Sequence, residues 1–374
     1  MKRIILVLIM ILLIPSLNTN ARITLEEIPG NDIAQEIIEE VPEETKELME
    51  EFGIDEISPQ SLLSLSFSDF LSFIFKSIKI RMAIPLKQIV LILGITVMCA
   101  LLKNFKTSFS SESISRIFDA VATVSVVLIM GDGIIDCIKK TCNIIQGYNT
   151  FMLSFIPVYA GSVTVAGAPV TSGVYSTFMF FACQVIGTLI NNTIMPLLCI
   201  YLGLSIASGI NEQLKLESIT QAIKKTATWS LTLLMTIFTG IMSIQTVIAN
   251  ASDSVATKTG KYILSSFVPV VGSALSEVFL SVQGCMKLLK NCIGGYCLVA
   301  VAVTFVPILL ELVVWKACVF ISQIFSEILN IKPISTLAKS LSSTFSVLIA
   351  IVLVFSLLII VSTTLMLILG QGRY

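Results

Sequence analysis

The stretch that decides the fold runs from Thr141 to Asn211 and reads TCNIIQGYNTFMLSFIPVYAGSVTVAGAPVTSGVYSTFMFFACQVIGTLINNTIMPLLCIYLGLSIASGIN. It contains no Asp, Glu, Lys or Arg. A helix that crosses a bilayer needs about 20 predominantly apolar residues, so this stretch alone can supply about three spans. A soluble domain holds roughly 25% charged residues and would carry charge over such a length. The stretch therefore predicts an integral membrane protein rather than a soluble enzyme.

The composition of the whole chain favours the same class. The 374 residues are 55% hydrophobic and 13% charged, and the formal net charge is zero. Because histidine is absent, His-ligated zinc and Ser-His-Asp triads are excluded, and the lack of a basic surplus gives no sign of a nucleic-acid partner. We expect no catalytic residue, metal site or cofactor. Most of the nine cysteines are expected to be small buried residues, with a disulfide or metal role as the alternative.

The first residues have the pattern of a secretory signal peptide. Lys2 and Arg3 form a positive start, and Ile4–Ile14 is apolar but too short to span a bilayer. Pro15 ends this apolar run, and Thr19 and Ala21 then offer small residues at the positions that a signal peptidase reads. The pattern predicts that residues 1–21 are removed, with an uncleaved anchor as the alternative.

Two polar segments precede the first span. Residues 22–60 hold thirteen acidic residues against two basic ones, and their apolar residues recur at helical spacing. They are predicted to be an exported acidic segment, either a solvated tail or a docking segment for a basic partner surface. Residues 61–82 are amphipathic and predict an interfacial helix on lipid headgroups. The alternative for residues 61–82 is the first part of a long tilted span.

Residues 83–374 are predicted to form a polytopic, all-α membrane domain with about eight spans. Turn signals at Ala168–Gly173 and at Asn191-Asn192-Thr193 divide the uncharged stretch. The positive-inside rule gives no consistent orientation. The spans are drawn from the segments Ile84–Leu102, Phe118–Ile138, 150–168, 174–190, 194–210, Trp229–Asn250, Tyr262–Leu280, Ile293–Val314 and Ser343–Gly370.

The membrane domain contains matching segments in a common order. Ser154-Phe155-Ile156-Pro157-Val158 recurs as Ser266-Phe267-Val268-Pro269-Val270. Two further pairs follow, namely Met195–Leu198 with Val306–Leu309 and Ile219–Lys224 with Ile334–Lys339. The matches indicate an internal repeat covering 150–250 and 262–370, with chance matching of apolar stretches as the alternative. Proline-broken segments in corresponding places are typical of transporter folds.

Five residues are the candidates for function: Pro157, Gly161, Gly167, Pro269 and Glu277. A proline inside a helix frees a backbone carbonyl, which a membrane tolerates only against protein or a wet cavity. The two prolines should therefore mark segments that face the protein interior, and the two glycines allow close helix packing or line a pathway.

Ionisable residues inside spans are costly and often functional. They are Asp119, Asp132, Asp136, Glu277 and Glu311. Glu311 is close enough to Trp315 to reach the membrane interface, and Asp132 and Asp136 can sit in a turn. Glu277 is therefore the strongest candidate, and we expect its side chain to contact protein rather than lipid.

The motif FMLSFIPVYAG at Phe151–Gly161, followed by VAGAP at Val165–Pro169, resembles the stage III sporulation protein AE family of endospore-forming bacteria. The resemblance covers nearly the whole chain. It implies a multi-pass protein of the mother-cell membrane around the forespore. It also implies a channel or secretion-like complex with other proteins of the stage III sporulation A operon and with stage II sporulation protein Q, needed for late forespore development. The family offers no catalytic motif to transfer. A stand-alone permease for a small solute is the alternative function.

Overall fold

The computed structural model describes residues 31–51, 54, 57, 67–105, 112–210, 216–267 and 272–369. Every element within these ranges is a helix, so the predicted all-α class is confirmed. The predicted signal peptide (1–21) and Pro269 lie outside the described residues. The elements are α2 (Asn31–Glu40), α3 (Glu43–Glu51), α5 (Phe67–Phe105), α6 (Glu112–Val165), α7 (Pro169–Leu189), the π-helical turn η2 (Ile190–Ile194), α8 (Met195–Ile210), α9 (Glu217–Phe267), α10 (Gly272–Ile328) and α11 (Lys332–Leu369).

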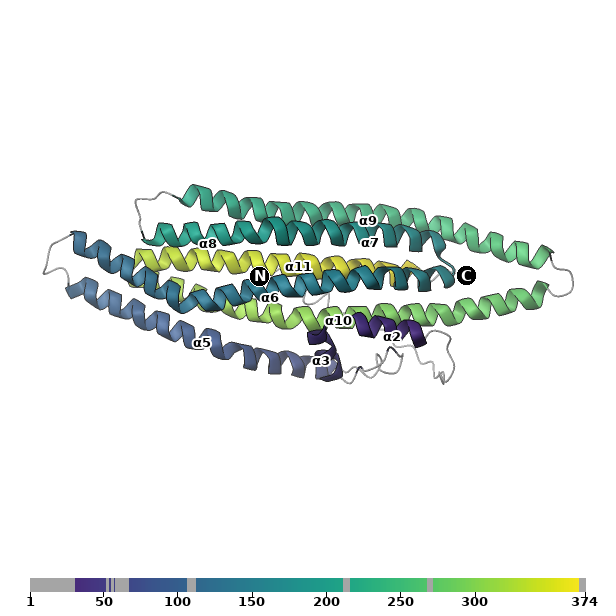
Figure 1. The fold of residues 1–374 in the computed structure, drawn as a ribbon, viewed down its shortest axis with the longest axis horizontal. Coiled ribbons are helices and arrows are strands. Elements are labelled where there is room, and N and C mark those ends of the chain that lie inside the picture. Colours follow the sequence, from purple (N-terminus) through teal and green to yellow (C-terminus); the bar gives the residue numbers. More distant parts are fainter. Residues whose placement is uncertain are drawn as a thin grey trace.

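The long helices lie side by side in one elongated bundle (Figure 1). The most extensive pairing is between α10 and α11, whose facing surfaces bury Phe305, Phe345 and Phe355. In this view α7, α8 and α9 lie on one side of α11, α5 lies on the other side beyond α10, and α6 overlaps the α10–α11 pair (Figure 1). Long helices pair most of their backbone N–H and C=O groups internally, as an apolar solvent demands.

Six helical segments in the described part of the chain are long and apolar enough to cross a membrane. They are Phe70–Leu102, Ala120–Val165, Pro169–Ile210, Ser218–Gln245, Ser281–Ile328 and Lys332–Ile368. A multi-pass membrane protein is therefore confirmed, whereas the count of about eight spans is not. The 54 residues of α6 extend for about 81 Å, which exceeds twice the hydrocarbon thickness of about 30 Å. One bilayer therefore covers less than half of α6.

The difference in span count arises where the sequence predicted breaks. Asn191-Asn192-Thr193 lies in η2, which continues directly from α7 into α8, so the polar run widens one helical turn and does not end the helix. Asp132 and Asp136 likewise lie inside the unbroken helix α6. The predicted span Tyr262–Leu280 includes the end of α9 at Phe267 and the start of α10 at Gly272, and residues 268–271 between them lie outside the described part of the chain, so this span stays a prediction.

The described part of the acidic segment packs on the bundle as the helix pair α2–α3. Ile37, Val41 and Met49 are buried, and the two helices contact α6 and α10. Thr45 Oγ1 lies 2.8 Å from Thr304 Oγ1 of α10, and Thr304 Oγ1 lies 2.9 Å from the hydroxyl of Tyr148 of α6. These residues are therefore held against the membrane helices and do not form a solvated tail.

The amphipathic residues that precede the first span continue into it. The helix α5 begins at Phe67 and runs to Phe105 without a break, with Pro85 inside it. The described residues of 61–82 thus form the first part of a long helix, which is the alternative that the sequence left open.

Candidate functional site

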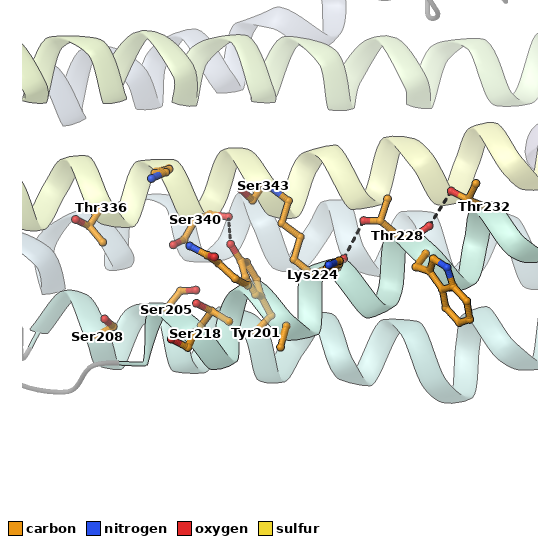
Figure 2. Close-up of a pocket in the computed structure, with 16 residues that line it drawn as sticks. Tyr201, Ser205, Ser208, Ser218, Lys224, Thr228, Thr232, Thr336, Ser340 and Ser343 are labelled. Carbon is orange, nitrogen blue, oxygen red and sulfur yellow. Dashed lines mark hydrogen bonds between the residues drawn. The ribbon is translucent and has the colours of Figure 1, made fainter.

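A polar cavity of about 1010 Å³ lies between α8, α9 and α11. It is near the end of the bundle where α9 and α11 both begin (Figures 1 and 2). Its described lining includes three lysines and no carboxylate. The lining residues that the argument uses are Tyr201, Ser205, Lys224, Lys225, Trp229, Lys339, Ser340 and Ser343. A basic, hydroxyl-rich cavity is unusual in a chain of this apolar composition.

Hydrogen bonds connect the walls of the cavity (Figure 2). Lys224 Nζ of α9 donates to Ser343 Oγ of α11 at 3.0 Å. The Tyr201 hydroxyl of α8 donates to the Ser340 carbonyl oxygen of α11 at 3.4 Å. Ser205 is 2% exposed, and its Oγ has no hydrogen-bond partner among the described residues. The three helices are therefore linked around the cavity, and one buried hydroxyl is left to interact with its contents.

The cavity brings together one of the matched sequence pairs. Ile219–Lys224 starts at the third residue of α9, and Ile334–Lys339 starts at the third residue of α11. Lys224 and Lys339 thus occupy the same position in two helices that begin at the same end of the bundle (Figure 1). Both lysines line the cavity. No sequence argument had linked this pair to a site.

The first matched pair is placed less symmetrically. Ser154–Val158 lies well inside α6, whereas Ser266 and Phe267 are the last residues of α9. The partner proline, Pro269, lies outside the described residues. The repeat as a whole stays a prediction.

The motif around Pro157 packs the core through its aromatic residues. Phe151, Phe155 and Tyr159 are buried, and their ring centroids follow one another along α6 at 5.5 and 5.2 Å. Pro157 and Gly161 lie on the exposed side of the same helix, and a Cβ added at Gly161 would meet nothing within 4 Å. The aromatic rings of this segment therefore face the protein interior. Pro157 and Gly161, which were candidates for function, lie on its exposed side.

Gly167 occupies the turn between α6 and α7. Its φ of +98° is left-handed, a conformation that glycine adopts at little cost. A Cβ there would lie 2.6 Å from Nε2 of Gln283 of α10. Asp253 of α9 accepts hydrogen bonds at 2.8 Å from the backbone N–H groups of Val170 and Thr171, which caps the first turn of α7. The turn was predicted at Ala168–Gly173, whereas the structure places it at residues 166–167 and begins α7 at Pro169. Four helices meet at this turn.

A model of the stage III sporulation protein AE family matches residues 46–370. The chain belongs to this family. The stage III sporulation protein AE of Bacillus subtilis (strain 168) is 26% identical over 266 residues. That alignment covers 71% of this chain and 65% of the relative, so the chain spans less than two thirds of the relative's length. No solved structure matches the chain. The resemblance carried by FMLSFIPVYAG is confirmed, and the protein is a multi-pass member of a sporulation family.

An ion-pair cluster in this stage III sporulation protein AE family member joins three helices. Glu311 of α10 contacts Arg81 of α5 at 2.5 Å and Lys140 of α6 at 3.1 Å. Lys140 also lies 2.8 Å from Asp136. The Glu311 side chain is 9% exposed, so it contacts protein, and its expected closeness to the membrane interface stays a prediction. A cavity of about 380 Å³ beside the cluster is also lined by Leu48 of α3.

One buried lysine was not predicted from the sequence, since all the candidate ionisable residues inside spans were acidic. Lys290 of α10 is 0% exposed, and its Nζ donates to the carbonyl oxygens of Met366 and Leu367 at 3.0 and 3.4 Å. These carbonyls belong to the last turn of α11, where helical acceptors lack intrahelical donors. Lys290 therefore supplies hydrogen-bond donors to the C-terminal end of α11 and links it to α10.

Glu277 lies close to the start of α10, and its side chain is outside the described part of the chain. The expectation that the Glu277 side chain contacts protein rather than lipid therefore stays a prediction. The nine cysteines are unpaired, and those that are buried are Cys137, Cys183, Cys292, Cys297 and Cys318.

Proposed function

We propose that this protein is a membrane component of the channel or secretion-like complex that links mother cell and forespore and is needed for late forespore development. Membership of the stage III sporulation protein AE family supports a role in sporulation. The apolar helices support a bilayer location, which we assign to the mother-cell membrane around the forespore. The proposed partners are other stage III sporulation A-operon proteins and the stage II sporulation protein Q complex. The proposed role is non-catalytic.

The observation that carries this proposal is the docked helix pair α2–α3. Its buried side holds it on α6 and α10, and Thr45 anchors it through Thr304 and Tyr148. Its remaining surface presents exposed acidic residues, namely Glu39, Glu43, Glu44, Glu47 and Glu50. A surface fixed before binding loses less conformational entropy on association, and clustered charge of one sign steers partners of the other sign. This arrangement suits a subunit that recruits a basic partner.

A triple substitution on the exposed side of α2–α3 tests the assembly role. The variant Glu39→Gln/Glu43→Gln/Glu47→Gln removes three charges and leaves the buried side intact. It should reach the membrane normally, co-purify less of the other operon proteins from sporulating cells, and lower the yield of heat-resistant spores. The control Asp132→Asn/Glu327→Gln removes exposed acids of α6 and α10 and should behave as wild type. Normal co-purification and normal spore yield of the triple variant would refute the proposal.

The cavity between α8, α9 and α11 favours a second function, that of a stand-alone permease. Its volume of about 1010 Å³ is enough for a small solute, since ligand pockets span about 300–1,000 Å³. Purified protein in liposomes separates the two functions. Solute flux without any partner protein would support the permease, and flux that needs the assembled complex would support the subunit role.

A further inference from the structure

We propose that the cavity between α8, α9 and α11 binds a phosphate-bearing group, held by Lys224 and Lys339 with Lys225 beside them. The proposal goes beyond the assembly role and does not depend on it. The group belongs either to an anionic phospholipid or to a soluble phosphate compound. The two sources share the same chemistry at the cavity and are separated by the experiment below.

The charge of the lining favours an anion. Lys224, Lys225 and Lys339 contribute three ammonium groups to one cavity. Within the described residues, neither Lys225 nor Lys339 has an ion-pair partner. Neighbouring charges of one sign repel each other, and an anion between them removes that repulsion. Lysine is a common phosphate ligand because its ammonium is a compact charge with three donors.

Some hydrogen-bond donors of the lining also lack an acceptor in the described part of the chain, and a bound anion could supply one. Lys224 uses one of its three N–H donors on the neutral hydroxyl of Ser343. Ser205 Oγ is buried without a partner among the described residues, although buried polar atoms in native proteins are nearly always hydrogen-bonded. A phosphate offers several strong acceptor oxygens. One phosphate could therefore accept hydrogen bonds from the lysines and from Ser205 together.

The placement of the lysines adds a geometric argument. Lys224 and Lys339 stand at the same position of two helices that start at the same end of the bundle (Figure 1), and both residues line the same cavity. Trp229 also lines the cavity and is 63% exposed. Tryptophan and lysine together are typical of the headgroup region of a bilayer. The cavity is therefore suited to a phosphate at the level of the membrane surface.

Binding to purified full-length protein in detergent tests the proposal. One arm measures radiolabelled inorganic phosphate by equilibrium dialysis. The other measures phosphatidylglycerol retained by the protein in native mass spectrometry, with diacylglycerol as the probe that lacks phosphate. The variants are Lys224→Gln/Lys339→Gln, the charge-preserving Lys224→Arg/Lys339→Arg, and the control Lys139→Gln/Lys332→Gln. The control removes two exposed lysines that do not line the cavity.

The wild type should bind one of the two phosphate probes and should not retain diacylglycerol. The glutamine pair should weaken that binding at least about tenfold, because hydrogen bonds to charged groups contribute about 1.5–3 kcal/mol each. The arginine pair and the control should keep most of it. Retention of phosphatidylglycerol alone identifies a lipid headgroup, and phosphate binding alone identifies a soluble compound. If neither probe binds the wild type, or the glutamine pair binds as the wild type does, the proposal is wrong.

Discussion

Removing the charge of Glu311 should destabilise the bundle more than removing any exposed carboxylate. The substitution Glu311→Gln keeps the shape of the side chain but leaves Arg81 and Lys140 without their shared anion. Glutamine can still accept one hydrogen bond, so the main loss is electrostatic. Lys140 keeps Asp136 as a partner at 2.8 Å, so the larger part of the effect falls on Arg81.

The magnitude follows from the exposure of the three groups. Glu311 is 9% exposed, whereas Arg81 and Lys140 are 35% and 44% exposed. A hydrogen bond to a charged group contributes about 1.5–3 kcal/mol, and partial exposure places both contacts at the lower end of that range. Because Lys140 keeps Asp136 as a partner, the expected loss is about 2–3 kcal/mol, which corresponds to a fall of about 3–4 °C in the unfolding midpoint of a chain of 374 residues.

Thermal unfolding of the purified protein in detergent measures this loss. The control is Glu327→Gln, an exposed glutamate on the same helix, which should shift the midpoint by no more than about 1–2 °C. A double-mutant cycle with Arg81→Met isolates the contact, and it should show coupling between the two positions. If Glu311→Gln unfolds within about 1–2 °C of the wild type, the cluster does not join the three helices as argued.

Three further outcomes are expected. Gly167→Ala should lower the free energy of unfolding by about 1–2 kcal/mol, because its φ of +98° is left-handed. The control Gly161→Ala lies on an open helix face and should be neutral or stabilising by up to about 1 kcal/mol. Asp253→Ala should cost about 1–2 kcal/mol through loss of the α7 cap, and Asp253→Asn should cost less, because asparagine also caps; equal effects would contradict a capping role. N-terminal sequencing of the mature protein should show cleavage after about Ala21, and an intact Met1 would contradict the predicted signal peptide.

Several properties of this protein follow from local sequence alone. The charge-free stretch from Thr141 to Asn211 dictates helices in a membrane, because an apolar solvent allows only structures that pair their own backbone groups. The turn at Gly167 is equally local, since glycine tolerates the positive φ that the turn needs and Pro169 lacks the backbone N–H that would continue a helix. The motif at Phe151–Gly161 was sufficient to indicate the family.

The tertiary structure alone decided where helices end and which residues meet. Asn191-Asn192-Thr193 predicts a turn in water, yet here it stays helical in η2, because a chain within lipid cannot exchange helical hydrogen bonds for water. Glu311 is paired with Arg81 of α5 and Lys140 of α6, which are distant from it in sequence, and no local pattern predicts these contacts. The cavity likewise depends on the packing of α8, α9 and α11. Periodicity and composition describe one segment at a time, whereas ion pairs and cavities form only when separate helices are packed together.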